Sequence, residues 1–138
     1  MVRHTERAGQ PRPRPRTLLL GVGDDPQQAA LARSEGADLV DVGAAAPGAR
    51  AAIQASLPAA TSWTGPPGHP LDVDLLAAAA GVSAGDPPAA VIATAAVCTW
   101  LGAPMVRSRH TRAVRRAIDM TESIAGRRLP ARTIRGLA

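Results

Sequence analysis

Lysine is missing from this chain of 138 residues, and all sixteen basic side chains are arginines. Aromatic residues are nearly missing as well, because there are two tryptophans and no phenylalanine or tyrosine. The interior must therefore be built from alanine, valine, leucine and isoleucine, which pack closely but bury less area each. Single-stranded nucleic acid is usually bound by stacking its bases on aromatic side chains, so this scarcity disfavours a nucleic-acid partner despite the net charge of +5.

The chain also has only one cysteine, Cys98, and no apolar run long enough to span a bilayer. A single cysteine excludes an internal disulfide, and Cys98 lies in an apolar helical run where it should be a packed thiol. The first sixteen residues are basic but have no apolar core, so they do not form a secretory signal. These absences predict a cytoplasmic protein with no membrane partner.

The length allows one domain, and an apolar fraction of 46% is enough for a core. A complete eight-unit β/α barrel needs roughly 200 residues or more, which this chain lacks. Charge is uneven, since residues 17–106 are acidic and both ends are basic. We therefore expect a disordered arm rich in arginine and proline over residues 1–16, an α/β domain over residues 17–126, and a basic tail over residues 127–138.

Apolar runs alternate with helical patterns along the domain. Strands are predicted at residues 17–22, 38–43 and 59–64, with a strand or turn at residues 81–85 and a last strand after Gly102. Helices are predicted over residues 26–36, 51–57, 75–80 and 87–101, and from Thr111 onwards. This order predicts about five β/α units around a parallel sheet. Such an open sheet exposes edges and a face, so we expect self-association or docking on a larger partner.

Aspartates stand where several helices should begin. Asp25 precedes a proline, and a capping residue followed by proline is a typical helix start. Asp72 or Asp74 should begin the third helix, and Asp86 should cap the fourth.

The last helix is predicted to have one apolar face and one charged face. The apolar face comprises Val114, Ala117, Ile118, Thr121 and Ala125. The charged face is predicted to hold most of five residues, Arg112, Arg115, Arg116, Asp119 and Glu122. Arg115 and Asp119 have the spacing of a helical ion pair.

Two segments resemble a known family. Residues 102–120 begin with Gly-Ala, continue through apolar residues to Arg107, and end in a helix. They are similar to the last strand and helix of dihydropteroate synthases, folate-pathway enzymes in which this turn typically reads Arg-Val-His-Asp-Val. Residues 35–43, followed by Pro-Gly-Ala at residues 47–49, resemble the second strand of the same family and the loop after it. The two segments cover about a quarter of the chain.

The resemblance implies a partial TIM-barrel-like fold from which the middle units are missing. It also implies a transferase reaction of folate biosynthesis, in which a pterin methyl diphosphate condenses with p-aminobenzoate and Mg²⁺ sits on the diphosphate. A pterin, or another small anionic ligand, would then be the partner of this chain.

The chain departs from the family pattern at several positions. Arg109 replaces the histidine of the last turn, and His110 replaces the aspartate. Residues 43–48 keep only the two glycines and the proline of the loop Gly-Glu-Ser-Thr-Arg-Pro-Gly. The first strand lacks the asparagine associated with a metal, and the acid and the lysine of the pterin pocket are also missing. These departures predict a protein that is impaired as a stand-alone catalyst.

An anion site is predicted at the basic turn. In the family the arginine at the position of Arg107 helps to hold the diphosphate, and a guanidinium beside a helix amino terminus has general affinity for anions. Arg107, Ser108 and Arg109, with the helix start near Thr111, form this candidate site. The alternative is that these arginines only solvate the end of a strand.

Aspartates supply the remaining candidates. Asp41 lies near the carboxyl end of the second strand, where parallel-sheet enzymes place their chemistry. Asp41, Asp72 and Asp74 could replace the missing acceptors for a pterin on the substrate side. Asp24 and Asp25 could meet a cation such as Mg²⁺, although adjacent acids in a loop are more often caps. The three histidines show no ligand spacing for zinc.

Two other functions stay open at this point. The chain could be a non-catalytic partner that regulates a full-length paralogue, or a basic protein associated with nucleic acid. No helix-turn-helix or zinc-finger pattern accompanies the basic ends, which disfavours the second.

Overall fold

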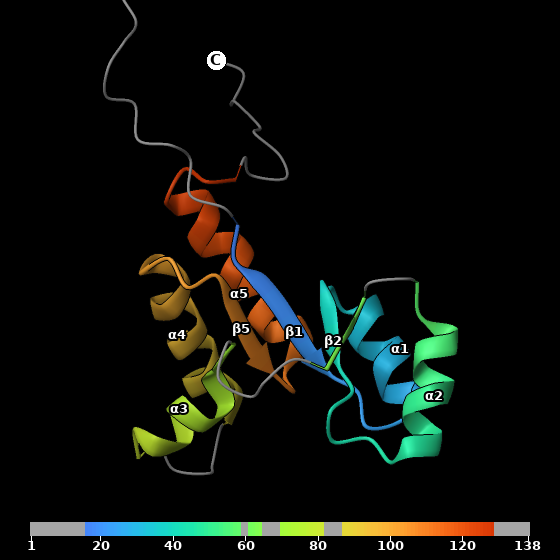
Figure 1. The fold of residues 1–138 in the computed structure, drawn as a ribbon. Coiled ribbons are helices and arrows are strands. Elements are labelled where there is room, and N and C mark those ends of the chain that lie inside the picture. The colour runs from blue at the N-terminus through green and yellow to red at the C-terminus, as the bar shows by residue number, and fades with distance from the viewer. Residues whose placement is uncertain (1–15, 59–60, 65–69, 82–86, 129–138) are drawn as a thin grey trace, which may run out of the picture.

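The computed structural model describes residues 16–58, 61–64, 70–81 and 87–128 (Figure 1). In chain order, the elements are β1 (Leu18–Val22), α1 (Pro26–Ser34), β2 (Leu39–Asp41), α2 (Pro47–Ser56), β3 (Ser62–Trp63), β4 (Leu71–Asp72), α3 (Val73–Ala79), α4 (Pro87–Trp100), β5 (Met105–Ser108) and α5 (Thr111–Ile124). The predicted α/β class is confirmed.

The five strands form one parallel sheet in the order β3-β2-β1-β5-β4. β1 lies at the centre, where Leu20 is the register partner of Leu39 in β2 and of Arg107 in β5. The predicted parallel sheet is therefore confirmed. The order of the elements along the chain departs from a regular alternation of strand and helix, because α3 and α4 both lie between β4 and β5.

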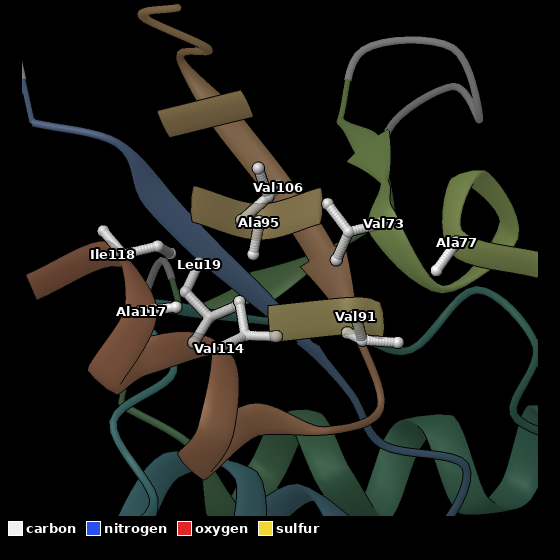
Figure 2. Close-up of a cluster of buried hydrophobic side chains, with 9 residues drawn as sticks. All are labelled: Leu19, Val73, Ala77, Val91, Ala95, Val106, Val114, Ala117 and Ile118. Atoms are coloured by element: carbon white, nitrogen blue, oxygen red, sulfur yellow. The ribbon is translucent and has the colours of Figure 1, made fainter. Parts of the chain in front are cut away.

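Among the described residues, all five helices pack against the same face of the sheet. Leu19 and Val106, which are register partners, join a buried cluster with side chains of α3, α4 and α5 (Figure 2). Gly21, two residues after Leu19 and therefore on the same face, is the partner of Val40. Val40 packs in a second cluster with α1 and α2. The opposite face carries no helix among the described residues.

That opposite face holds a different set of side chains. Alternation along the strands places Leu20 and Arg107 there as partners, and Asp72 beside Arg107. Asp41, the partner of Trp63, lies on the same face. Polar residues from three strands are thereby gathered on the surface that the helices leave uncovered.

Helix starts follow the predicted caps. The side chain of Asp25 accepts a hydrogen bond from the backbone N–H of Gln28 (2.9 Å), and Asp72 accepts one from Leu75 (3.0 Å). Strand β4 was not predicted, because two residues are too short to show periodicity and form a strand only by pairing with β5. The predicted cap Asp86 and most of the predicted element at residues 81–85 lie outside the described residues.

The predicted position of Glu122 on the charged face of α5 is wrong. The helical pattern groups Glu122 with the residues of the charged face, but it is completely buried. Its carboxylate accepts hydrogen bonds from the backbone N–H of Thr17 (2.6 Å) and from Nε of Arg16 (3.3 Å). The start of β1 packs beside α5, so this carboxylate satisfies a buried donor that has no partner in the sheet.

The ion pair predicted within α5 is confirmed. Arg115 pairs with Asp119 at 2.7 Å within the helix and also reaches Asp38 at 3.0 Å. Of the two predicted basic ends, only Arg16, Arg127 and Arg128 are among the described residues. None of the helices in the described ranges combines the length and apolarity that crossing a membrane requires.

Replacing Gly36 with alanine is expected to lower the free energy of unfolding by about 1–2 kcal/mol. Gly36 follows α1 with φ +102°, and an added Cβ would lie 2.8 Å from Cγ of Arg115. Gly48→Ala is the matched control, because no atom lies within 4 Å of its added Cβ. The control should be neutral or slightly stabilising. Urea denaturation measures both variants, and equal effects would contradict the role assigned to Gly36.

Candidate functional site

A pocket of about 470 Å³ opens at the ends of the strands, where Asp41, Asp72 and Arg107 lie near Leu75 of α3. It is lined by Asp41, Gly43, Ala44, Trp63, Pro70, Asp72, Leu75 and Arg107. Parallel sheets commonly bind ligands at this end of their strands, and the volume suits a small molecule.

Arg107 lies between two aspartates in this pocket. Its Nε is 2.7 Å from Oδ2 of Asp41, and its Nη1 is 2.6 Å from Oδ2 of Asp72. The three side chains are only 22%, 18% and 19% exposed, respectively. Arg107 therefore ties the ends of β2 and β4 together from its place on β5.

The surroundings of Arg107 stabilise its protonated, positively charged form. Partial burial disfavours a charged guanidinium, but the hydrogen bonds and negative charges of Asp41 and Asp72 outweigh burial and raise the pKa of Arg107. With two carboxylates around one guanidinium, these three side chains carry a net negative charge. A ligand that donates hydrogen bonds is therefore favoured over a bare anion.

The two aspartates can accept further hydrogen bonds. Oδ1 of Asp41 accepts the N–H of Gly43 at 2.8 Å, and Oδ1 of Asp72 accepts the N–H of Leu75 at 3.0 Å. A carboxylate offers about four lone-pair positions, and each of these carboxylates uses two for the hydrogen bonds just described. Both can therefore bind a ligand donor while staying fixed by the protein.

The structure does not bring the three predicted anion-binding residues together. Successive side chains of a strand point to opposite faces, so Ser108 points toward the helices and Arg107 away from them. Ser108 is buried, and its Oγ donates to Oδ1 of Asp74 at 2.6 Å. The backbone N–H of Arg109 donates to Oδ2 of Asp74 (2.7 Å), and its guanidinium pairs with Asp24 at 3.0 Å.

Only two of the five predicted aspartates line the pocket, and the other three make contacts elsewhere. Asp41 and Asp72 line the pocket, whereas Asp74 holds the start of the turn after β5. Asp24 pairs with Arg109, and Asp25 caps α1. Within the described ranges, no three His, Cys, Asp or Glu side chains are grouped so that they could hold a metal ion.

Trp63 is one of the pocket residues that the sequence analysis does not assign to a site. It was recognised only as part of a weak strand, but β3 pairs with β2 and places Trp63 beside Asp41. The signal that could have found it is its position in a strand next to the one that carries Asp41. His69, which follows in the chain, lies outside the described residues.

Cys98 lies away from the pocket, on α4. It is partly buried against the cluster of Leu19 and Val106, and burial raises the pKa of its thiol. The prediction of a packed thiol is confirmed.

No protein-family model matches this chain, and comparisons with curated proteins and with solved structures also gave no match.

Proposed function

We propose that this chain is a dihydropteroate synthase-like protein of pterin metabolism that binds a pterin ring at Arg107, Asp41 and Asp72. The observation that carries the proposal is the convergence of two partly buried carboxylates on one guanidinium in a pocket of about 470 Å³. A pterin has an amino group and ring N–H groups that need fixed acceptors, and these carboxylates have lone pairs left to accept them.

We propose that the sheet is an arc of a TIM-type barrel. In a closed barrel each strand lies beside its predecessor in the chain, and the last strand lies beside the first. The order β3-β2-β1-β5-β4 is what remains when strands are missing between β3 and β4. The placement of all helices on one face supports this reading, because a doubly wound sheet carries helices on both faces.

The diphosphate is the part of the ligand that this site accommodates least readily. The guanidinium of Arg107 is already bonded to two carboxylates, so a diphosphate needs either to displace one of them or to bring Mg²⁺ with it. Mg²⁺ prefers phosphate and carboxylate oxygens and would offset the charge. We therefore propose that the ring supplies most of the affinity and that turnover by the chain alone is weak.

Two alternative functions were considered. A regulatory partner of a full-length paralogue would bind the same ligand in the same pocket as a catalytic protein, but without turnover. Nucleic-acid binding is less well supported, because most arginines among the described residues are already bonded to a carboxylate or a carbonyl oxygen.

Titration of the full chain with a pterin methyl diphosphate, with the pterin alone and with inorganic diphosphate tests the proposal. We expect calorimetry to detect both pterins without Mg²⁺ and to detect inorganic diphosphate weakly or not at all. Asp72→Asn should weaken pterin binding about tenfold or more, because it removes a charge-assisted acceptor. Asparagine still caps a helix, so α3 should keep its start.

Asp25→Asn is the matched control, because it changes the same chemical group at a helix cap outside the pocket. It should bind pterin as the unchanged chain does. Absence of pterin binding, or equal loss in both variants, would contradict the proposed site. A dihydropteroate assay with added p-aminobenzoate measures turnover, and rapid turnover that Arg107→Ala abolishes would show that the chain is a competent catalyst.

A further inference from the structure

Trp63 is one of two tryptophans in a chain that has no phenylalanine or tyrosine. The other, Trp100, lies at the end of α4. Trp63 is only partly buried and belongs to neither of the two buried hydrophobic clusters. Packing of the core therefore does not account for its position at the pocket.

Strand pairing holds Trp63 beside Asp41. The two residues are register partners in β3 and β2, and neighbouring strands lie about 4.8 Å apart. The backbone N–H of Val42 donates to the carbonyl oxygen of Trp63 at 3.2 Å, which fixes the end of β3. A ligand bonded to the carboxylate of Asp41 is therefore within reach of the indole ring.

Apolar side chains flank both carboxylates of the pocket. Trp63 lies beside Asp41. Leu75 lies beside Asp72, whose carboxylate accepts the backbone N–H of Leu75 at 3.0 Å. A ligand that suits this arrangement has hydrogen-bond donors along one edge and an apolar face, which is the chemistry of a planar heteroaromatic ring.

We propose that Trp63 stacks on the ring of the ligand and makes the pocket selective for flat aromatic heterocycles. This inference rests on the proposed function, because it specifies which ring chemistry the same pocket prefers. Aromatic rings attract each other through their faces when they are stacked with an offset. Stacking of a nucleic-acid base on an aromatic side chain changes affinity by roughly 5- to 150-fold, and a pterin ring has a similar size and polarity.

Two ligands separate stacking from hydrogen bonding. Pterin is flat throughout, whereas 5,6,7,8-tetrahydropterin carries the same amino and N–H groups on its pyrimidine ring but has a saturated, puckered second ring. The carboxylates of Asp41 and Asp72 can accept hydrogen bonds from either ligand. Trp63 can stack fully only on the flat one, so we expect the chain to bind pterin roughly tenfold more tightly.

Calorimetric titration of the full chain with each ligand, under anaerobic conditions, measures this preference. Trp63→Leu should weaken pterin binding roughly tenfold and leave the two ligands with nearly equal affinity. Trp63→Phe should keep most of the preference, because phenylalanine retains an aromatic face. Trp100→Leu is the matched control, since it removes the tryptophan on α4, and it should bind both ligands as the unchanged chain does.

Nuclear magnetic resonance gives a second measurement on the unchanged chain, which does not depend on whether a variant folds. The two indole N–H signals are assigned with the tryptophan variants that fold. We expect pterin to shift the signal of Trp63, through the ring current of the stacked ligand, and to leave that of Trp100 in place.

The outcomes distinguish this inference from the proposed function. If pterin binds but Trp63→Leu keeps the preference for the flat ring, the stacking role is wrong and the pterin site stands. Equal weakening of both ligands by Trp63→Leu would show a merely structural role for the indole and would also overturn the inference. If neither ligand binds the unchanged chain, the proposed function itself is wrong.

Discussion

Arg107→Leu is expected to abolish pterin binding and to lower the free energy of unfolding by about 2 kcal/mol. The substitution leaves the carboxylates of Asp41 and Asp72 close together without the cation that both now contact at 2.7 and 2.6 Å. Removing one partner of a fully buried ion pair costs about 3–5 kcal/mol, and the partial exposure of these side chains reduces that figure. Urea denaturation followed by tryptophan fluorescence measures the stability, and calorimetry measures the binding.

Arg109→Leu is the control for this experiment. It removes an arginine two residues away whose contact with Asp24 is largely exposed, and exposed pairs contribute at most about 1 kcal/mol. Equal effects of the two substitutions at neutral pH would show that Arg107 does not organise the pocket.

Glu122→Ala is expected to lower the free energy of unfolding by about 3 kcal/mol. Glu122 is completely buried, and its removal leaves the buried N–H of Thr17 without an acceptor. An unsatisfied buried donor costs about 1–3 kcal/mol, and the lost side-chain volume adds a cavity. Glu122→Gln keeps a side-chain oxygen for Thr17 and should recover at least half of the loss.

Glu35→Ala provides the comparison for Glu122. Glu35 meets Arg112 at 3.6 Å, and the arginine is 66% exposed, so the contact should contribute little. Denaturation midpoints for the three variants should follow the order Glu35→Ala, Glu122→Gln, Glu122→Ala, from most to least stable. A Glu122→Ala chain as stable as Glu35→Ala would contradict the role given to the buried carboxylate.

The sequence determined most of the local structure. In the part of the chain that the structure describes, the patterns of apolar residues, prolines and caps predicted four of the five strands and all five helices. These signals act over a few neighbouring residues. Asp25 and Asp72 cap the helices that they were expected to begin. The pairing of Arg115 with Asp119 followed from helical spacing alone.

Tertiary structure decided how distant residues meet. Arg107 is 66 residues from Asp41 and 35 from Asp72 along the chain, and only the placement of β2, β4 and β5 in one sheet brings the three together. Glu122 is another example, because it is buried by a contact with the start of β1 that no helical pattern contains. Side-chain identity and spacing fix local conformation, whereas strand order and register fix which charges share a pocket.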